Sequence, residues 1–372
     1  MSEQVAIVGA GPAGLAVAAC LKRRGVPAVV LEARAQVAPV WRQHYDRLHL
    51  HTAKGGSSLP GLDFPSDYPR FPSRQQFIAY LEGYAKHFDI QPAFQEPVTR
   101  IAPNGAGWAI TTQNRALPVR HAVIATGYTR LPLEPTWPGQ DRFRGPVVHT
   151  SRYRNGAPFK GQQVLIVGMG NSGAEIAIDL HESGAQPTIA VRSPVSVIPR
   201  ELLGLPILSV AALFRSLPPR VGDLLAAPLL ALAIGDITKL GLRRRPYGPL
   251  EQVKRDARVP LIDVGTLALI REGKVKIAPG LERFTETSAV FAGGASQPFD
   301  AVVLATGFRP ALEQFLPSAA ELCDAKGFPR ADGQVKPGLH LCGFQLSTRG
   351  MLKEISIEAE RTAEEIASSL RN

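Results

Sequence analysis

A pattern of three glycines occurs twice in this 372-residue chain, each time between an apolar strand and a helix. The first copy is Gly9-Ala10-Gly11-Pro12-Ala13-Gly14, and the second is Gly168-Met169-Gly170-Asn171-Ser172-Gly173. In this pattern the first glycine makes a tight turn, the second lets a pyrophosphate approach the backbone, and the third lets the helix pack closely on the strand. We therefore expect two dinucleotide-binding units in one chain.

The residues around each fingerprint predict a strand, a helix and a second strand, which is the start of a Rossmann-like unit. The predicted elements are Val5–Val8, Ala13–Arg23 and Ala28–Leu31 in the first unit, and Val164–Val167, Ala174–Ser183 and Thr188–Val191 in the second. Further along, each unit has a short apolar strand that runs into Ala-Thr-Gly, within Ala122–Gly127 and Ala301–Gly307. The predicted fold class is α/β with two Rossmann-like domains.

The residue that ends the second strand differs between the two units and indicates two different ligands. Glu32 stands at this position in the first unit and can accept hydrogen bonds from the diol of a ribose, which favours FAD. Arg192 and Ser193 stand there in the second unit. A guanidinium and a hydroxyl can bind a 2′-phosphate that a carboxylate would repel, which favours NADPH over NADH. The alternative for Arg192 is an ordinary surface cation.

The three cysteines, Cys20, Cys323 and Cys342, form neither a Cys-x-x-Cys pair nor a metal-ligand spacing, so no metal site is expected. A disulfide reductase of this architecture needs a redox dithiol, so electrons are expected to leave the flavin toward another acceptor, and oxygen is the obvious one. The same cysteine usage and the absence of a signal peptide favour a cytoplasmic protein.

The net charge of +10 fits binding of polyanionic cofactors, and the densest basic run, Arg243-Arg244-Arg245, lacks the interleaved aromatic residues of a nucleic-acid platform. No nucleic-acid partner is expected. The apolar run Leu224–Ile234 is too short for a membrane span, which needs about 20 residues. We expect one or two buried helices around Pro228, with peripheral membrane contact or a homodimer interface as alternatives.

Between the fingerprints, Phe143, Gly145, His149 and Tyr153 match F-x-G-x-x-x-H followed by an aromatic residue four positions later. In this signature the chain resembles the flavin-containing monooxygenases. With Tyr153 in place of tryptophan at the last position of the signature, the chain resembles the branch of the family that oxygenates heteroatoms or keto acids. The resemblance is closest to the YUCCA-like subgroup and extends along nearly the whole chain, through Tyr68–Phe77, Val197–Glu201, Gly248–Leu250, Asp263–Leu267 and Leu304–Phe308.

The resemblance implies an NADPH-dependent FAD monooxygenase that forms a C4a-peroxyflavin from O2 and oxygenates a small organic substrate. That substrate is a keto acid such as indole-3-pyruvate, or a soft nitrogen or sulfur nucleophile. The alternative is an NADPH oxidase, or flavin reductase, that releases hydrogen peroxide. For His149 the resemblance implies a role in orienting the domains and NADPH, whereas alone it would be a structural histidine.

His51 and Lys54 are the predicted catalytic residues, because their segment matches the family segment beside the reactive edge of the flavin. His51 could donate a hydrogen bond to the peroxide, and Lys54 could hold negative charge; the alternative is that His49 and His51 are structural histidines of a strand. The chain departs from plant YUCCA sequences in Gly55–Ser58 and Gly350–Ile355, so the substrate is left open.

The predicted NADPH domain is inserted into a discontinuous FAD domain. The expected ranges are 1–155 for the first part of the FAD domain, 160–300 for the NADPH domain with a helical insertion at about 205–249, and 301–372 for the second part of the FAD domain. The predicted cofactor-binding residues are Gly9, Gly11, Gly14, Glu32, Arg42, Thr126, Gly127, His149, Gly168, Gly170, Asn171, Ser172, Gly173, Arg192, Ser193, Thr306 and Gly307.

Overall fold

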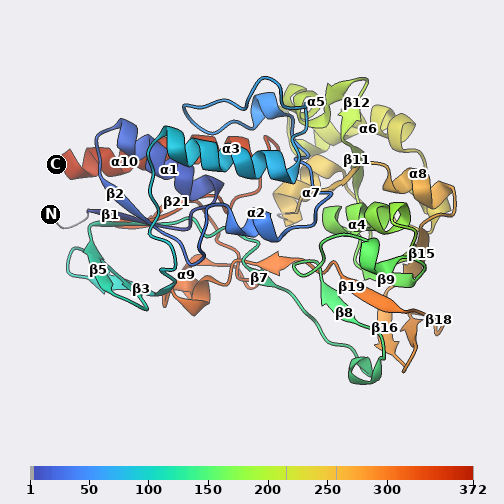
Figure 1. The fold of residues 1–372 in the computed structure, drawn as a ribbon. Helices are drawn as coiled ribbons and strands as arrows, with labels where there is room; N and C mark the ends of the chain where they lie inside the picture. Colours follow the sequence, from blue (N-terminus) through green and yellow to red (C-terminus); the bar gives the residue numbers. More distant parts are fainter. Residues whose placement is uncertain (1–3, 215, 257, 372) are drawn as a thin grey trace. The chain divides into compact units, whose positions relative to one another are not determined.

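The computed structural model describes residues 4–214, 216–256 and 258–371, and the chain divides into two compact units. The first unit comprises residues 1–42, 52–131 and 308–372, and the second comprises residues 43–51 and 132–307. The chain therefore passes from one unit to the other at four points. We describe each unit by itself, with the element labels of Figure 1.

The first unit contains a five-stranded sheet in the order β2-β1-β6-β22-β21. These strands are β1 (Val5–Val8), β2 (Ala28–Leu31), β6 (His121–Ile124), β21 (Gly333–Lys336) and β22 (Leu339–Leu341). All neighbours run parallel except β21 and β22. Every residue of β1 and β6 is buried, as expected for parallel strands covered on both faces. The strands predicted over 5–8 and 28–31 are confirmed with the same bounds.

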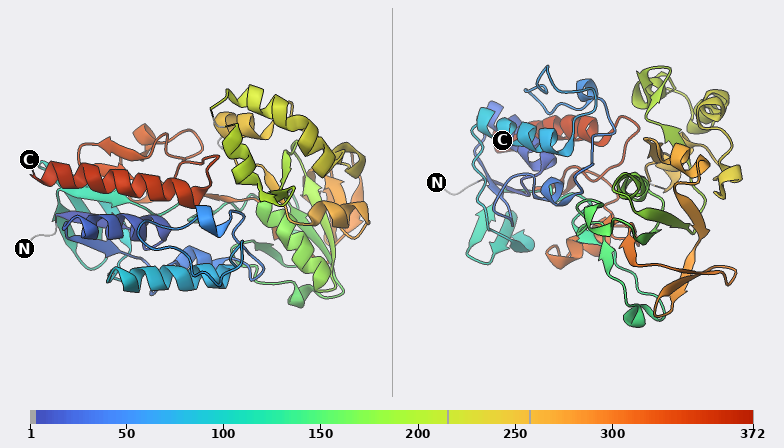
Figure 2. Two further views of the ribbon diagram at one scale, coloured as in Figure 1. Left: turned by 90° about the horizontal axis from the view of Figure 1, so that it is seen from above. Right: turned by 45° about the vertical axis from the view of Figure 1, so that its right-hand side comes forward.

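The longer helices of the first unit are α1 (Pro12–Arg23), α3 (Arg74–His87) and α10 (Met351–Arg371). Helix α1 contacts both others, and both views of Figure 2 show α1 and α10, from the two ends of the chain, side by side. Pro12 suits the first turn of α1, where the amide it lacks would have no partner in the helix. Lys22 and Arg23 in the last turn complement the negative end of the helix dipole.

The smaller elements of the first unit include an antiparallel sheet in the order β3-β4-β5, in which Trp108 and Ile110 face the core. These elements are β3 (Val98–Asn104), β4 (Gly107–Thr112), β5 (Ala116–Val119), η1 (Lys54–Gly56), η5 (Leu312–Gln314), α9 (Ala319–Leu322) and β20 (Phe308–Arg309). Two short elements, α2 (Pro39–Gln43) and β7 (Leu131–Pro132), lie where the chain passes between the units.

The second unit contains a wholly parallel sheet in the order β15-β10-β9-β19-β8. Its strands are β8 (Val147–His149), β9 (Gln163–Val167), β10 (Gln186–Val191), β15 (Lys276–Pro279) and β19 (Ala301–Leu304). Helix α4 (Asn171–Glu182) follows β9 and packs on β10, which confirms the second predicted strand-helix-strand unit. β8 and β19 lie in this sheet, although we expected their residues in the FAD domain.

The other elements of the second unit lie between or after these strands. They are η2 (Gln140–Arg142), η3 (Ala157–Phe159), β11 (Val197–Pro199), β12 (Glu201–Leu202), β13 (Leu205–Pro206), α5 (Ile207–Leu213), α6 (Pro219–Ile234), η4 (Ile237–Leu240), α7 (Pro249–Asp256), β14 (Leu261–Asp263), α8 (Thr266–Arg271), β16 (Leu281–Phe284), β17 (Ser288–Phe291) and β18 (Ser296–Pro298). Strands β16, β17 and β18 form a small antiparallel sheet.

The region predicted as a helical insertion contains α5 and α6, but the expected burial of Leu224–Ile234 is wrong. One helix, α6, runs through Pro228, and its buried residues are only Gly222, Asp223 and Ile234. Leu224 is 73% exposed and Leu232 is 84% exposed. An apolar composition predicts burial only where another element covers the helix, and most of α6 has no such cover among the described residues of this unit. Within the described residues, no helix is long and apolar enough to span a bilayer.

Candidate functional site

The first glycine loop follows β1 and has the shape that its sequence predicts. Gly9 has a φ of 111°, and a Cβ on it would lie 2.7 Å from the carbonyl oxygen of Ala125. A Cβ on Gly14 would lie 1.9 Å from the carbonyl oxygen of Gly9. A Cβ on Gly11 would meet no protein atom within 4 Å. The outer glycines are therefore required by the fold, whereas Gly11 borders open space at the amino end of α1, where a pyrophosphate would fit.

Glu32 is held beneath this loop by two backbone hydrogen bonds. The amides of Ala10 and Arg34 donate to its two carboxylate oxygens, each at 2.9 Å. The side chain is 5% exposed, and burial raises the pKa of Glu32 although both amides act in the opposite direction. Each carboxylate oxygen keeps a second lone pair, so the residue can still accept a hydrogen bond from a ribose hydroxyl.

The Ala-Thr-Gly segment after β6 lies directly against the first glycine loop. The amide of Ala125 donates to the carbonyl oxygen of Val8 at 2.9 Å, which continues the pairing of β1 with β6. Within the described part of the chain, the hydroxyl oxygen of Thr126 is buried and has no hydrogen-bond partner. An unpaired buried hydroxyl costs free energy, so this oxygen is a candidate partner for a polar ligand. This observation supports a nucleotide cofactor in the first unit.

The second glycine loop, between β9 and α4, repeats this geometry. Gly168 has a φ of 107°, and a Cβ on it would lie 2.7 Å from the carbonyl oxygen of Ala305. A Cβ on Gly173 would lie 2.2 Å from the carbonyl oxygen of Gly168, whereas one on Gly170 would meet nothing within 4 Å. The two fingerprints thus place their open glycine at the same point relative to the strand and the helix.

Arg192 and Ser193 follow β10, and both residues are exposed. No described residue forms a hydrogen bond or ion pair with the guanidinium of Arg192, so it is available to an anion. The basic run Arg243-Arg244-Arg245 lies beside it. The guanidinium of Arg243 donates to the carbonyl oxygen of Arg192. The amide of Val195 in turn donates to the carbonyl oxygen of Arg243 at 2.8 Å. Sequence reasoning missed Arg243, because its only signal was a basic run that begins 51 positions after Arg192.

Two further predicted residues in this loop are engaged with the protein. Asn171 Oδ1 accepts a hydrogen bond of 2.8 Å from the amide of Ile262, which joins β14 to the start of α4. Ser172 lies beside the hydroxyl of Tyr45. Both side chains therefore shape the second loop from within the unit.

His149 contacts the Ala-Thr-Gly segment that follows β19. Its Nε2 lies 3.0 Å from the carbonyl oxygen of Gly307, and its Nδ1 accepts a hydrogen bond from the amide of Ser151 at 3.1 Å. Burial lowers the pKa of His149, so the neutral Nε2–H form is favoured. The Thr306 hydroxyl donates to the carbonyl oxygen of Leu133. The Ala-Thr-Gly segment after β19 is thus joined to the end of β8 through His149 and to the residue after β7 through Thr306.

The remaining residues of the signature pack inside the second unit. The hydroxyl of Tyr153 donates to Asp179 at 2.5 Å, and its ring stacks on Phe159. A Cβ on Gly145 would lie 2.3 Å from the carbonyl oxygen of Asp300 and 2.7 Å from the ring of Phe143. The signature Phe143–Tyr153 therefore builds the β8 edge of the sheet.

His51 lies in the second unit, in a bend rather than in the strand considered as the alternative. Its Nε2 is hydrogen-bonded to the carboxylate of Glu175 on α4. The His51 side chain is 16% exposed and that of Glu175 is 5% exposed. His49 is exposed, and its Nδ1 lies 2.6 Å from the carbonyl oxygen of Arg47. The two histidines therefore have different surroundings.

Lys54 and Arg42 lie in the first unit and bind parts of its own fold. The ammonium group of Lys54 donates to three carbonyl oxygens, of Pro65 at 3.3 Å, Ser66 at 2.6 Å and Tyr68 at 2.5 Å. An ammonium group has three donors, so this arrangement uses all of them in holding a loop. The Arg42 Nε donates to the carbonyl oxygen of Val37 at 3.0 Å, and its guanidinium pairs with Glu82.

The three cysteines are free and buried. Burial raises the pKa of Cys20 to about 12 and that of Cys342 well above its ordinary value. A thiol acts in redox exchange as the thiolate, which burial in such surroundings disfavours. Free thiols are already reduced, and only a disulfide could take electrons from a flavin, so these cysteines as they stand are no electron acceptor.

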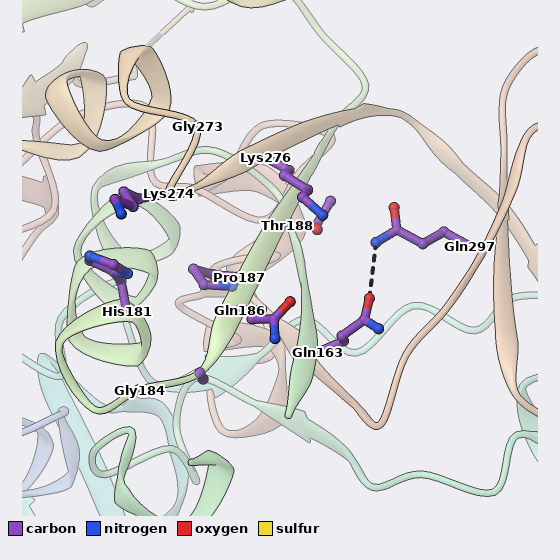
Figure 3. A pocket seen from close by; sticks show the side chains of 11 residues that line it. Gln163, His181, Gly184, Gln186, Pro187, Thr188, Gly273, Lys274, Lys276 and Gln297 are labelled. Atoms are coloured by element: carbon purple, nitrogen blue, oxygen red, sulfur yellow. Dashed lines mark hydrogen bonds between the residues drawn. The ribbon is translucent and has the colours of Figure 1, made fainter. Parts of the chain in front are cut away.

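A pocket of the second unit lies at the wrong end of the sheet for a dinucleotide. It is lined by residues at the amino ends of three strands, including Gln163, Gln186 and Lys276, and by His181 near the carboxyl end of α4 (Figure 3). In open α/β sheets, ligands bind at the carboxyl ends of the strands, where the Gly168 loop lies. We assign this pocket no role in the reaction.

Comparison with known proteins agrees with the two-loop architecture. The profile of a family described as pyridine nucleotide-disulphide oxidoreductase matches residues 6–199. The chain is 40% identical to the indole-3-pyruvate monooxygenase YUCCA6 of Arabidopsis thaliana, over 97% of this chain and 89% of that protein. The chain belongs to the flavin-containing monooxygenase family. It is also 41% identical to the indole-3-pyruvate monooxygenase YUCCA1 of Oryza sativa subsp. japonica, over 93% of this chain and 87% of that protein.

Solved structures of other monooxygenases have the same fold. A flavin-containing monooxygenase from Stenotrophomonas maltophilia is 25% identical, with a TM-score of 0.73 over 99% of each chain. Cyclohexanone monooxygenase is 16% identical, with a TM-score of 0.76 over 99% of this chain and 88% of that one, and supports the fold alone. The chain is therefore a flavin-dependent monooxygenase of the two-domain Rossmann type, and its expected resemblance to the YUCCA-like subgroup is confirmed.

Proposed function

We propose that the protein holds FAD in its first unit and NADPH in its second, and oxygenates a small α-keto acid such as indole-3-pyruvate. The observation that carries the cofactor assignment is the pair of glycine loops with equal geometry and opposite charge. The first loop has Glu32 and the buried Thr126 hydroxyl beside it, whereas the second has the unpaired guanidinium of Arg192. A ribose diol suits the first set of groups and a 2′-phosphate suits the second.

Bound FAD and NADPH would supply hydride transfer and activation of O2, while the protein positions and shields them. In the first unit, the amides at the start of α1 and the space beside Gly11 would hold a pyrophosphate. In the second, Arg192 and Arg243 would bind the 2′-phosphate, and Gly170 would leave room for the pyrophosphate. Thr126, Gly127, Thr306 and Gly307 would line the two loops opposite these groups.

We propose His51 as the residue of this chain that acts nearest the reaction. Its ring is fixed through Nε2, is partly exposed, and has no hydrogen bond from a described residue to Nδ1. Lys54 has no such freedom, because its three donors hold carbonyl oxygens. We therefore do not extend the proposal to Lys54.

The substrate class rests on the relatives named indole-3-pyruvate monooxygenases. The test is to incubate the purified protein, FAD and NADPH in air with indole-3-pyruvate, phenylpyruvate, an amine and a sulfide, and to analyse each product by mass spectrometry. The proposal predicts that a keto acid loses carbon dioxide and gives the shorter carboxylic acid. Hydrogen peroxide as the only product with every compound would favour an NADPH oxidase instead.

We propose that the exposed leucines of α5 and α6 contact an anionic lipid surface. They include Leu213, Leu224, Leu225 and Leu232, which are 54–84% exposed. Residues 200–258 carry ten basic and five acidic side chains, and this excess of positive charge is half of the net charge of the chain. Apolar side chains among excess positive charge suit anionic headgroups, whereas two copies of this region would repel each other.

The three buried free thiols support a reducing, cytoplasmic setting.

This contact can be tested by sedimentation with vesicles. Wild-type protein should sediment with phosphatidylserine vesicles and not with phosphatidylcholine vesicles, and a Leu224→Ser, Leu232→Ser variant should stay in solution. Leu133→Ser, at a leucine that is 39% exposed elsewhere in the unit, is the matched control. Equal binding of all variants, or a dimer that only the leucine substitutions dissociate, would contradict the lipid proposal.

A further inference from the structure

Residues 43–51, which we name the crossing segment, belong to the second unit although the residues on both sides belong to the first. Several bonds attach it there. The amide of Asp46 donates to the carbonyl oxygen of Arg154 at 2.8 Å, and the side-chain amide of Asn155 donates to Asp46 at 3.0 Å. Arg47 forms an ion pair with Glu182 on α4. Most of these contacts are exposed, and such pairs contribute little to stability.

Besides the apolar packing of Tyr45 and Leu48, the crossing segment has a buried polar contact with one carboxylate, that of Glu175. This residue lies in the second turn of α4 and is 3% exposed. The Nε2 of His51 is hydrogen-bonded to its Oε1. The hydroxyl of Tyr45, which is 1% exposed, faces Glu175 and Ser172, and burial together with the nearby carboxylate raises the pKa of Tyr45 well above its ordinary value. Two residues of the crossing segment thus converge on Glu175.

A buried carboxylate is costly unless donors surround it, so this convergence has an energetic reason. It also has a chemical consequence. A carboxylate can only accept, so the Nε2 of His51 must carry the proton in this bond. In the neutral ring Nδ1 then has a lone pair, and no described residue occupies it. The Nδ1 of His51 is therefore placed to accept a proton, whereas we expected from the sequence that His51 could donate a hydrogen bond to the peroxide.

We propose that Glu175 is a positioning residue for the oxygenation. Its carboxylate keeps the crossing segment on α4 and holds the His51 proton on Nε2, so that Nδ1 is the ring nitrogen offered to the reaction. This inference rests on the proposed function for its role in the reaction. The position of the proton is a property of this chain alone and can be measured without turnover.

The first experiment measures the ring nitrogens of His51 by ¹⁵N NMR in protein labelled at histidine, with His51→Asn to assign the signals. Wild-type protein should show a protonated Nε2. Glu175→Ala should populate both tautomers, whereas Glu175→Gln should keep the proton on Nε2, because its amide oxygen still accepts. Glu182→Ala removes the other α4 carboxylate that contacts the crossing segment and should leave the His51 spectrum unchanged.

The second experiment measures the fraction of consumed NADPH that is recovered as oxygenated product. Loss of a hydrogen bond to a charged group is worth about one factor of ten, so Glu175→Ala should lower this fraction about tenfold, Glu175→Gln less, and Glu182→Ala less than about twofold. Circular dichroism reports whether each variant folds. If Glu175→Ala does not fold, the comparison of Glu175→Gln with wild type still tests the proposal.

The outcomes separate the two proposals. An unchanged His51 spectrum in Glu175→Ala, an equal change in Glu182→Ala, or unchanged recovery of product in Glu175→Ala overturns the role of Glu175. Absence of oxygenated product in the wild-type protein overturns the proposed function instead, and the NMR result then still decides whether Glu175 places the proton.

Discussion

Replacing the glycines of the first loop one at a time should separate loss of the cofactor from loss of the fold. In Gly14→Ala the new Cβ would lie 1.9 Å from the carbonyl oxygen of Gly9, a backbone atom that cannot move away by rotation. Overpacking of this kind costs about 1–3 kcal/mol, and the contact with backbone places this variant at the upper end. We therefore expect Gly14→Ala to lower the free energy of unfolding by about 3 kcal/mol.

Gly11→Ala should behave differently, because its Cβ meets no protein atom within 4 Å. Gly11 has a φ of −84° and a ψ of −173°, which alanine adopts without strain. The entropy lost from the unfolded chain favours alanine by about 0.4–1 kcal/mol. The poorer capping by alanine than by glycine opposes this by about 0.5–1 kcal/mol. The net effect on stability is close to zero, while the methyl group occupies the space that we assign to the pyrophosphate.

The assay is urea unfolding of the apoprotein followed by tryptophan fluorescence, since Trp108 is buried in the core of the first unit, with FAD content read from flavin absorbance. Gly11→Ala should unfold like wild type and bind FAD at least about tenfold more weakly, whereas Gly14→Ala should unfold earlier. Gly25→Ala, at a turn glycine with a φ of 71°, controls for general backbone strain. Normal FAD binding by Gly11→Ala, or normal stability of Gly14→Ala, would refute the reasoning.

Three further outcomes follow from the site and the core. Arg192→Ala should raise the KM for NADPH about 10- to 100-fold and leave that for NADH unchanged, because a charge-assisted bond to phosphate is worth about 1.5–3 kcal/mol; equal effects on both cofactors would contradict a 2′-phosphate site. A thiol reagent should label less than one cysteine per chain before denaturation and three afterwards, and rapid labelling of the native protein would show that the thiols are accessible. Burial, and to a smaller extent His121, lower the pKa of His340 to about 4. As the pH falls, this histidine therefore binds a proton in the unfolded chain before it does so in the folded one, and the free energy of unfolding should decrease between about pH 6.5 and pH 4. His340→Gln should flatten this acid limb by up to about 3 kcal/mol in urea titrations, and an unchanged limb would exclude His340 as its cause.

The features that sequence predicted well are local ones. The strand-turn-helix units depend on residues within about thirty positions of one another, and the glycines and the buried strands carry that information themselves. Glu32 and Arg192 stand where the local pattern places them, and the structure adds that Glu32 is anchored by two amides while Arg192 is open.

The features that sequence did not predict depend on contacts between distant segments. Nothing near His51 indicates that its partner is Glu175, 124 positions away, or that the crossing segment belongs with the second unit. Lys54 looked available because the three carbonyl oxygens that bind it leave no mark on residue type. The exposure of Leu232 was missed for a similar reason, since hydropathy reports what a residue prefers and not what covers it.

The central claim, that the chain uses NADPH to place one atom of O2 in an organic substrate, is tested most directly with ¹⁸O2. Indole-3-pyruvate, NADPH and the FAD-loaded protein would be incubated under ¹⁸O2, and product, carbon dioxide and NADPH would be quantified together. The balance R–CO–COOH + O2 + NADPH + H⁺ → R–COOH + CO2 + NADP⁺ + H2O predicts one ¹⁸O atom in the new acid for each NADPH consumed. An unlabelled acid, or consumption of NADPH with all of the oxygen recovered as hydrogen peroxide, would contradict the claim.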